Sequence, residues 1–331
     1  MKIILPVAGK GTRLRPHTYT RAKSLVTVAG KTVLEHILDN LLELNYEKEF
    51  IFITDENGEQ IKNFVKEKYP DLKTHFTVQK ERLGPAHAVW LAKDFINEED
   101  DILIVFNDTM FITDLNRIIE ETKELDGLIF SKEVDDPRRF GVNVVKDGII
   151  VDMVEKPDKF VSNLAQVGLY YIKNGKKLMD AIEYTIKKNI KTKGEFYLPS
   201  AFLYMIKNGA KFGAPKIDYW LDCGTKEALL NTNRFLLKKH DNSSEISSKN
   251  SLIIPPNFID PSAIIENSII GPFVSIGKGV KIKNSIIKSS IINNFAEIDT
   301  INISNSIIGE NAFVKGNEKS INIGDDCVIK I

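Results

Sequence analysis

A glycine-rich loop that carries an arginine lies directly after the first apolar run of the chain. Its sequence is Gly9-Lys10-Gly11-Thr12-Arg13. Glycines let the backbone approach a phosphate and turn N–H groups toward it, and an arginine adds a permanently charged, planar fork. A dinucleotide-binding fingerprint would need glycine where Leu14 stands, and a Walker A loop would need glycine in place of Leu25. A phosphate-binding loop and a plain strand-to-helix turn both fit this segment.

Two aspartates each come at the end of a short apolar run, where a carboxylate could hold a metal ion. Asp108 follows the run 101–106, and Asp222 ends the stretch 219–222. In open α/β sheets ligands bind beyond the carboxyl ends of the strands, and Mg²⁺ prefers carboxylate and phosphate oxygens. The spacing does not show whether the two carboxylates meet. Taken alone, Asp108 could begin a turn and Asp222 could cap a helix.

The elements that must position these residues alternate along the first 235 residues, where short apolar runs are separated by amphipathic stretches. The expected strands are Lys2–Val7, Phe50–Thr54, Thr74–Val78, Asp101–Phe106, Gly127–Ser131, Gly141–Val145 and Gln166–Ile172. The expected helices are 33–44, 61–69, 86–95, 176–189, 196–207 and 225–237. Thr32 and Glu35 form a capping box at the start of the first helix. The pattern predicts an α/β domain over residues 1–237, with a Rossmann-like, mostly parallel sheet sandwiched by helices.

The composition changes beyond residue 251. From Ser251 to Ile331 there are 22 isoleucines, one leucine and ten asparagines, and isoleucines recur every five or six residues. Hexapeptide repeats of this kind form three-sided parallel β-helices in which the isoleucines point inward and about three repeats make one coil. We therefore expect a three-sided parallel β-helix over 252–331, joined to the first domain by a polar linker, 238–251.

Charge and cysteine content narrow the possible partners and the compartment. Lysine plus arginine total 45, as do aspartate plus glutamate, so the formal net charge is zero. This balance offers no overall field for binding nucleic acid or an anionic membrane. The chain has two cysteines and no apolar run long enough to span a membrane, and its first residues read as a strand and not as a signal peptide. We expect a reduced, cytoplasmic protein.

Together, these motifs resemble those of the sugar-1-phosphate nucleotidyltransferases. The loop at 9–13 is similar to the family's G-x-G-T-R signature, 83–88 to its LGTAxA-type segment, and 140–142 to its (Tyr/Phe)-Gly-Val motif. Glu155-Lys156-Pro157 matches the EKP motif, and Val167-Gly168 follows it as in the family. Several members also carry a C-terminal left-handed β-helix, so the resemblance implies that the β-helix over 252–331 is left-handed. The resemblance therefore covers nearly the whole chain.

The resemblance implies roles for individual residues. Lys23 and Lys156, each of which alone is typical of a surface lysine, become phosphate-binding residues beside Arg13, and these three form the expected catalytic set. Asp108 and Asp222 match the two aspartates that hold Mg²⁺. The implied nucleotide-binding residues are Val7, Ala8, Gly9, Gly11, Thr12, Gln79 and Gly84. The implied sugar-phosphate-binding residues are Phe140, Gly141, Glu155, Lys156 and Gly168.

The implied reaction joins a nucleoside triphosphate and a sugar 1-phosphate into a nucleotide sugar and releases pyrophosphate. Because Gln79 matches the base-reading glutamine, we expect dTTP or UTP, with glucose 1-phosphate as the sugar. GTP with mannose 1-phosphate, and a non-catalytic regulatory or scaffold subunit, remain open. Acetyl transfer by the β-helix is not expected, because residues 241–331 contain no histidine to act as a base. The β-helix is expected to support a homo-oligomer.

Overall fold

The computed structural model describes residues 1–56, 58–239 and 248–316, which form two compact units. The first, here called the catalytic unit, comprises Met1–Val26 and Thr32–Ala228; the second, the β-helix unit, comprises Thr27–Lys31 and the chain from Leu229 onward. Residues 240–247, most of the expected linker, lie outside the described residues, as do 317–331 of the expected β-helix. The domain boundaries at 237 and 252 remain predictions.

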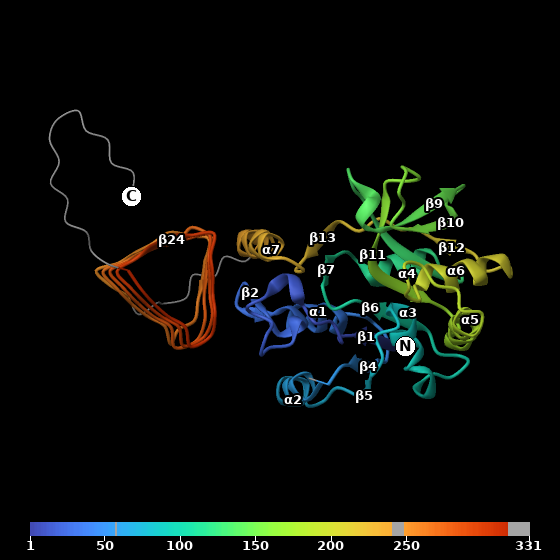
Figure 1. Ribbon diagram of the computed structural model, residues 1–331, viewed down its shortest axis with the longest axis horizontal. Coiled ribbons are helices and arrows are strands. Elements are labelled where there is room, and N and C mark those ends of the chain that lie inside the picture. Colours follow the sequence, from blue (N-terminus) through green and yellow to red (C-terminus); the bar gives the residue numbers. More distant parts are fainter. Residues whose placement is uncertain (57, 240–247, 317–331) are drawn as a thin grey trace. The chain divides into compact units, whose positions relative to one another are not determined.

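The catalytic unit is built on a nine-stranded sheet in the order β5-β4-β1-β6-β11-β8-β12-β10-β9 (Figure 1). Its first four strands are parallel, and β1 lies between β4 and β6. The chain therefore leaves β1 toward one edge and returns on the other side, which makes the carboxyl end of β1 a topological switch point. These strands are β1 (Lys2–Pro6), β4 (Glu49–Thr54), β5 (Thr74–Val78) and β6 (Ile102–Val105).

The rest of the sheet is mixed, because β11 runs antiparallel to β6, β8 and β9, and β10 runs antiparallel to β9 and β12. The predicted Rossmann-like α/β class is confirmed. The sequence analysis missed β10, whose exposed and buried residues do not alternate strictly. These strands are β8 (Gly127–Glu133), β9 (Gly141–Lys146), β10 (Ile149–Glu155), β11 (Leu164–Ile172) and β12 (Phe212–Gly213).

Three helices, α3, α5 and α6, pack against the sheet in a core that includes Ile4, Ile104 and Phe202. The predicted capping box is present at the start of α1, where the Thr32 side chain accepts from the Glu35 backbone N–H. The helices are α1 (Val33–Leu42), α2 (Gly58–Lys68), α3 (Pro85–Trp90), α4 (Leu115–Glu121), α5 (Gly175–Lys187), α6 (Leu198–Lys207) and α7 (Lys226–Lys239). No helix in the described part of the chain is both long and apolar enough to cross a membrane.

Two separate two-stranded sheets lie outside the nine-stranded sheet. Strand β7 (Thr109–Ile112) pairs antiparallel with β13 (Tyr219–Asp222), more than one hundred residues later. Strands β2 (Thr27–Val28) and β3 (Lys31–Thr32) form a separate two-stranded sheet. The β7–β13 pair matters most for the site, because Asp222 is the last residue of β13 and Asp108 directly precedes β7.

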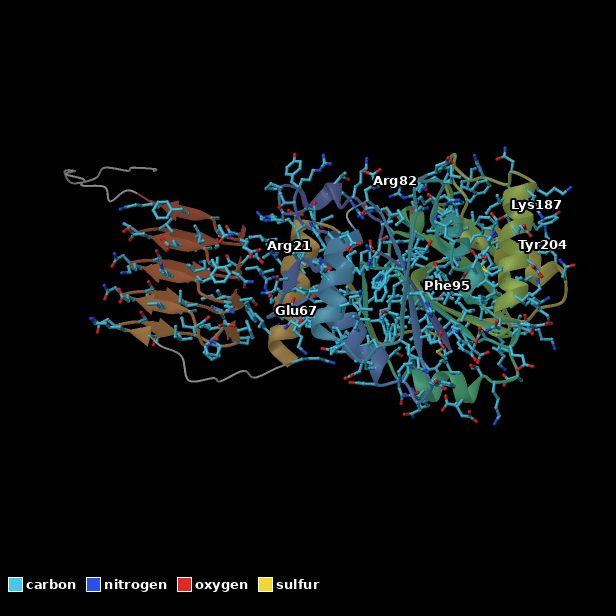
Figure 2. The ribbon with its side chains drawn as sticks, turned by 90° about the horizontal axis from the view of Figure 1, so that it is seen from below. Arg21, Glu67, Arg82, Phe95, Lys187 and Tyr204 are labelled. Atoms are coloured by element: carbon cyan, nitrogen blue, oxygen red, sulfur yellow. The ribbon has the colours of Figure 1, made fainter. Side chains whose placement is uncertain are left out.

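The β-helix unit confirms the predicted left-handed β-helix. Its coils have three sides, visible end-on as the orange and red triangle in Figure 1, and stack as parallel layers in Figure 2. The repeating isoleucines align in register, as in the column Ile259, Ile276, Ile292 and Ile308. The three sheets are β14-β17-β20-β23-β26, β15-β18-β21-β24 and β16-β19-β22-β25.

The strands of the β-helix are two or three residues long, and several turns between them use asparagine in the left-handed conformation, as at Asn267 and Asn284. The first eight strands are Ser248–Lys249 (β14), Leu252–Ile253 (β15), Asn257–Ile259 (β16), Ile264–Glu266 (β17), Ile269–Ile270 (β18), Val274–Ile276 (β19), Lys281–Lys283 (β20) and Ile286–Lys288 (β21). The last five are Ile291–Ile292 (β22), Glu297–Asp299 (β23), Asn302–Ser304 (β24), Ile307–Ile308 (β25) and Phe313–Lys315 (β26).

Candidate active site

One cavity of the catalytic unit gathers residues that are far apart in the sequence. Its volume is about 490 Å³. Its walls come from the ends of β6, β9 and β10, the middle of β11, strand β13, the starts of α3 and α6, and the glycine-rich loop. Eight of the predicted site residues line it. They are Arg13, Asp108, Phe140, Gly141, Glu155, Lys156, Gly168 and Asp222.

The two predicted metal aspartates meet at this cavity. The pairing of β7 with β13 places Asp222 opposite Thr109, the residue next to Asp108. Asp222 Oδ1 accepts a hydrogen bond from the Gly224 N–H at 2.7 Å. Asp108 Oδ2 accepts one from the Lys23 ammonium, also at 2.7 Å. Lys23, which is largely buried, therefore forms an ion pair with Asp108.

These carboxylates fit Mg²⁺, which is commonly held by one or two protein carboxylates and completes its shell with water and substrate phosphates. Within the described ranges, no group of three or more histidine, cysteine, aspartate or glutamate side chains could form an all-protein metal site. An ion held by Asp108 and Asp222 would therefore take further ligands from a bound phosphate.

The glycine-rich loop is tightly folded around Gly11. Gly11 has a φ of 60°, and the Thr18 hydroxyl donates to its carbonyl at 2.7 Å. A Cβ on Gly11 would lie 3.0 Å from the Thr18 side chain and 3.1 Å from Lys23 Cβ. Thr12 then begins a short 3₁₀ helix that carries Arg13. The loop and Lys23 are thus held together, although Gly11, Thr12 and Lys23 do not line the cavity.

Arg13 reaches toward the loop that follows Asp222. A Cβ on Gly224 would lie 3.0 Å from Arg13 Nη2 and 2.9 Å from Asp222 Oδ1. The guanidinium and this carboxylate therefore flank the same glycine. The arrangement places a permanent positive charge beside the predicted metal position, where phosphate oxygens would gather.

The predicted base-binding residues lie outside the lining of the cavity. Val7 and Ala8 are buried beyond the end of β1, and the backbone N–H of Val7 donates to Ile53 at 2.8 Å. Gln79 follows β5, and its Nε2 donates to the Gly84 carbonyl at 3.3 Å. These residues gather at the carboxyl ends of neighbouring parallel strands, where α/β sheets bind nucleotides.

Two buried polar atoms near the glycine-rich loop have no hydrogen-bond partner among the described residues. They are Ser24 Oγ, next to Lys23, and Asn107 Nδ2, next to Asp108. Gly9 is exposed, and the nearest atom to a Cβ built on it is this same Asn107 Nδ2, at 3.7 Å. Unpaired buried polar groups are rare in native proteins. We therefore expect that water or a bound ligand pairs with these two atoms.

The predicted sugar-phosphate end is organised around Glu155 and Lys156. The Lys156 backbone has a φ of 47°, and its N–H donates to the Phe140 carbonyl at 3.0 Å. The Lys156 ammonium lies 3.4 Å from Glu155 Oε1 and donates to the Tyr197 hydroxyl at 3.2 Å. These bonds fix both ends of the lysine at the cavity wall.

The same contacts shift the ionisation of both groups. Burial raises the pKa of the Glu155 carboxyl above its ordinary value, against the opposing charge of Lys156. Burial disfavours the charge on Lys156, but the Tyr197 hydroxyl and Glu155 outweigh it and raise the pKa of the ammonium. Lys156 is therefore fully charged at neutral pH and suited to a phosphate.

Sequence reasoning missed several residues that line the cavity. Trp220 meets the Phe140 ring edge-on, with ring centroids 5.0 Å apart, and Tyr197 contacts Lys156. Gln166 is a buried polar residue on β11 and was not singled out. One signal was available for it: a polar side chain within an otherwise apolar strand has to find partners. The other polar lining residues missed are Thr109, Arg139 and Tyr170.

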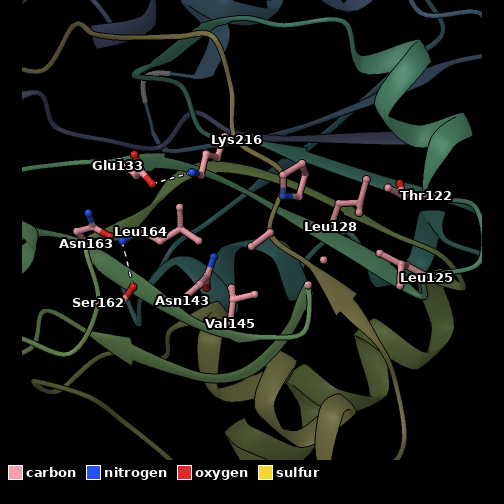
Figure 3. A pocket seen from close by; sticks show the side chains of 14 residues that line it. Thr122, Leu125, Leu128, Glu133, Asn143, Val145, Ser162, Asn163, Leu164 and Lys216 are labelled. Carbon is pink, nitrogen blue, oxygen red and sulfur yellow. Dashed lines mark hydrogen bonds and ion pairs between the residues drawn. The ribbon is translucent and has the colours of Figure 1, made fainter.

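A second cavity of the catalytic unit, of about 510 Å³, contains none of the predicted residues (Figure 3). It lies beside β8, β9 and β12 and is lined by aliphatic side chains such as Leu128 and Leu164. Lys216 and Glu133, both at this cavity, form an ion pair at 2.7 Å. The polar side chain of Asn143 also lines this cavity and is fully buried.

Comparison with known sequences places the chain among enzymes. The family model described as nucleotidyl transferase matches residues 1–239. The bifunctional protein GlmU of Methanocaldococcus jannaschii is 31% identical over 100% of this chain and 83% of its own length. The glucose-1-phosphate thymidylyltransferase of Streptomyces antibioticus is 30% identical over 95% of this chain and 93% of its own. The UTP–glucose-1-phosphate uridylyltransferase AglF of Haloferax volcanii is 32% identical over 69% of this chain and 93% of its own length.

Against other relatives named GlmU, from Methanococcus maripaludis and Methanococcus vannielii, the chain spans 60–62% of their length. Among solved structures, a putative glucose-1-phosphate thymidylyltransferase from Bacillus anthracis matches 74% of this chain and 98% of its own, with a TM-score of 0.62 and 25% identity. The chain belongs to the nucleotidyl transferase family, and within it to the sugar-1-phosphate nucleotidyltransferases.

Proposed function

We propose that this enzyme transfers a nucleotidyl group from dTTP or UTP to glucose 1-phosphate in the presence of Mg²⁺, and releases pyrophosphate. The observation that carries the proposal is the β7–β13 pairing, which brings Asp222 beside Asp108 in a cavity that Arg13, Glu155 and Lys156 also line. Groups suited to a triphosphate and groups suited to a sugar phosphate thus line the same cavity. Relatives that are named for glucose 1-phosphate support the choice of sugar.

The physical problem of the reaction is electrostatic repulsion. A sugar phosphate dianion must approach the α-phosphate of a triphosphate that carries about four negative charges, and at ~5 Å their repulsion amounts to several kcal/mol even at an effective dielectric near 20. Mg²⁺ held by Asp108 and Asp222 would supply neutralising charge on the phosphates. Arg13 and Lys23 would add positive charge for the pyrophosphate that leaves.

The sugar end would supply position. Lys156 would bind the incoming phosphate, and Glu155 would accept hydrogen bonds from sugar hydroxyls. No general base is required, because the attacking phosphate oxygen is already ionised. Catalysis then comes from holding the two reactants in line and from stabilising charge with groups that are fixed in advance.

Pyrophosphate release from the purified full chain tests the proposal. Five nucleoside triphosphates (dTTP, UTP, GTP, ATP and CTP) would be crossed with glucose, mannose and N-acetylglucosamine 1-phosphates, with and without Mg²⁺. We expect release that requires both substrates and the metal, strongest with dTTP or UTP and glucose 1-phosphate. Release only with GTP and mannose 1-phosphate would replace the proposed substrates. If folded protein released no pyrophosphate with any pair of substrates, a non-catalytic subunit would be favoured.

A further inference from the structure

A chain of three buried polar side chains ends at the cavity of the active site. The Ser131 hydroxyl donates to the Ile129 carbonyl at 2.8 Å, and Asn143 Nδ2 donates to Ser131 Oγ at 2.9 Å. Gln166 Nε2 in turn donates to Asn143 Oδ1 at 2.8 Å. Ser131 and Asn143 are completely buried, and Gln166, which is 7% exposed, lines the cavity. We call this set the Ser131–Asn143–Gln166 relay.

The relay fixes which end of each amide faces which neighbour. A backbone carbonyl only accepts hydrogen bonds, so the Ser131 hydroxyl that bonds Ile129 must donate its one proton there. Ser131 Oγ is then an acceptor, which requires Asn143 to present its NH₂ group and to turn its oxygen toward Gln166. Gln166 must therefore present its own NH₂ group to Asn143.

The opposite end of the Gln166 amide is the oxygen. A Cβ built on Gly141, another lining residue, would lie 3.1 Å from Gln166 Oε1 and 2.8 Å from Glu155 Oε2. The two oxygens thus lie on the same side of the Gly141 backbone. This part of the cavity wall presents two neighbouring acceptors, one neutral and one a carboxylate.

The second cavity does not loosen the relay. Asn143 is one of its lining residues, as Figure 3 shows, yet the side chain has no exposed surface and both of its polar atoms have partners in the relay. Water in that cavity therefore cannot compete for these atoms. The Asn143 amide is paired at both of its polar atoms and is therefore held in a single orientation.

We propose that Gln166 is a specificity-determining residue that accepts a hydrogen bond from one hydroxyl of the sugar, with its amide held in the accepting orientation by Asn143 and Ser131. The inference rests on the proposed function and narrows its substrate. The sugar 1-phosphate carries a hydrogen-bond donor at this position, next to the one that Glu155 binds. A sugar with a carboxylate there is excluded, because three acceptor groups would face one another without a proton.

Deoxyfluoro analogues of glucose 1-phosphate test the proposal, since fluorine keeps the size of a hydroxyl and cannot donate. The full-length wild type and Gln166→Met would be assayed for kcat/KM with glucose 1-phosphate and with its 2-, 3-, 4- and 6-deoxyfluoro forms. In the wild type we expect kcat/KM for at least one analogue to be about 30-fold lower than for glucose 1-phosphate. In Gln166→Met, kcat/KM for glucose 1-phosphate should fall by a similar factor. The ratio of kcat/KM between glucose 1-phosphate and one of those analogues should fall to within about threefold, while the ratios for the other analogues stay at their wild-type values.

Asn143→Leu tests the positioning part of the relay. Without Asn143 the Gln166 amide can turn, so discrimination against the same analogue should shrink by about tenfold. Asn163→Leu is the matched control, because Asn163 lines the second cavity but is exposed and lies outside the relay. It should keep the wild-type discrimination, a ratio that a general loss of stability does not alter.

Two results would overturn the inference. One is wild-type enzyme that turns over glucose 1-phosphate but does not distinguish any deoxyfluoro analogue. The other is a Gln166→Met variant that keeps every discrimination ratio of the wild type. Absence of turnover by the wild type with the unmodified sugar phosphates would instead reject the proposed function on which the inference rests, and the inference with it.

Discussion

The two ends of the active site are built differently. At the predicted sugar-phosphate end, Lys156 is bonded at its backbone and its ammonium, and the Ser131–Asn143–Gln166 relay pairs both polar atoms of Asn143 and the Nε2 atom of Gln166. At the nucleotide end, Ser24 Oγ and Asn107 Nδ2 are buried without a partner among the described residues. An unsatisfied buried group costs about 1–3 kcal/mol. From this contrast we predict that the sugar end is preformed and that the nucleotide end is completed by its ligand.

The largest expected loss comes from Asp108→Asn, which removes a charge at the nucleotide end. The amide keeps the size of the carboxylate but cannot balance a divalent cation, so we expect turnover to fall at least ~100-fold with the fold intact. Steady-state kinetics and circular dichroism check both parts. Asp180→Asn, which changes an exposed aspartate on α5, is the matched control and should have wild-type turnover. Near-normal activity of Asp108→Asn would reject its role in metal binding.

Lys156→Met addresses the sugar end. It removes a charged hydrogen-bond donor that we assign to the sugar phosphate, and such bonds contribute about 1.5–3 kcal/mol. We expect the KM for the sugar 1-phosphate to rise about 10- to 100-fold, with little change in the dissociation constant of the nucleotide. Lys146→Met, on the exposed end of β9, is the control. An equal weakening of both substrates would mean that the two ends are not separate.

Gly9→Ala sharpens the comparison from the nucleotide side. A methyl group fits at this position in the structure, since the nearest atom is 3.7 Å away. Thermal stability should therefore stay at the wild-type value, while nucleotide affinity falls about tenfold because the backbone can no longer approach the ligand as closely. Calorimetric titration with the triphosphate measures this. Unchanged affinity would show that the nucleotide does not pack on Gly9.

How much of this site follows from the sequence depends on how local each feature is. The loop 9–13, the capping box at Thr32 and the isoleucine repeat are short patterns, and the structure contains each as expected. The meeting of Asp108 with Asp222 depends on strands β7 and β13, which are distant in the chain and too short for a clear pattern. Asn143 and Gln166 interrupt apolar strands, but the sequence does not show that they bond each other.

The pH dependence of sugar use is a smaller effect and concerns Glu155. Burial raises the pKa of this carboxyl, so it takes up a proton at a higher pH than an exposed glutamate does. As the pH falls through that raised pKa, the carboxylate is lost and kcat/KM for the sugar phosphate should decrease, since kcat/KM reports the free enzyme. Glu155→Gln should have low activity without this acid limb. A variant that kept the limb would assign it to another group.

The smallest expected effect is a gain in stability from Ser24→Ala. The hydroxyl is buried without a partner among the described residues, so its removal should stabilise the fold by about 1 kcal/mol. Asn143→Leu, at the sugar end, should instead destabilise it, because Ser131 and Gln166 lose their bonds. Urea denaturation of both variants compares the two ends directly. Destabilisation by Ser24→Ala equal to that by Asn143→Leu would contradict the difference between them.

The most direct test of the whole account is the identity of the product. Purified full-length protein with Mg²⁺, UTP or dTTP, and glucose 1-phosphate would be followed by phosphorus NMR. The account predicts the two coupled resonances of a nucleoside diphosphate sugar, together with an equal amount of pyrophosphate, and their disappearance in Asp108→Asn. A spectrum that gains only inorganic phosphate, or that keeps only the starting compounds, would contradict the proposed transfer from UTP or dTTP to glucose 1-phosphate in this cavity.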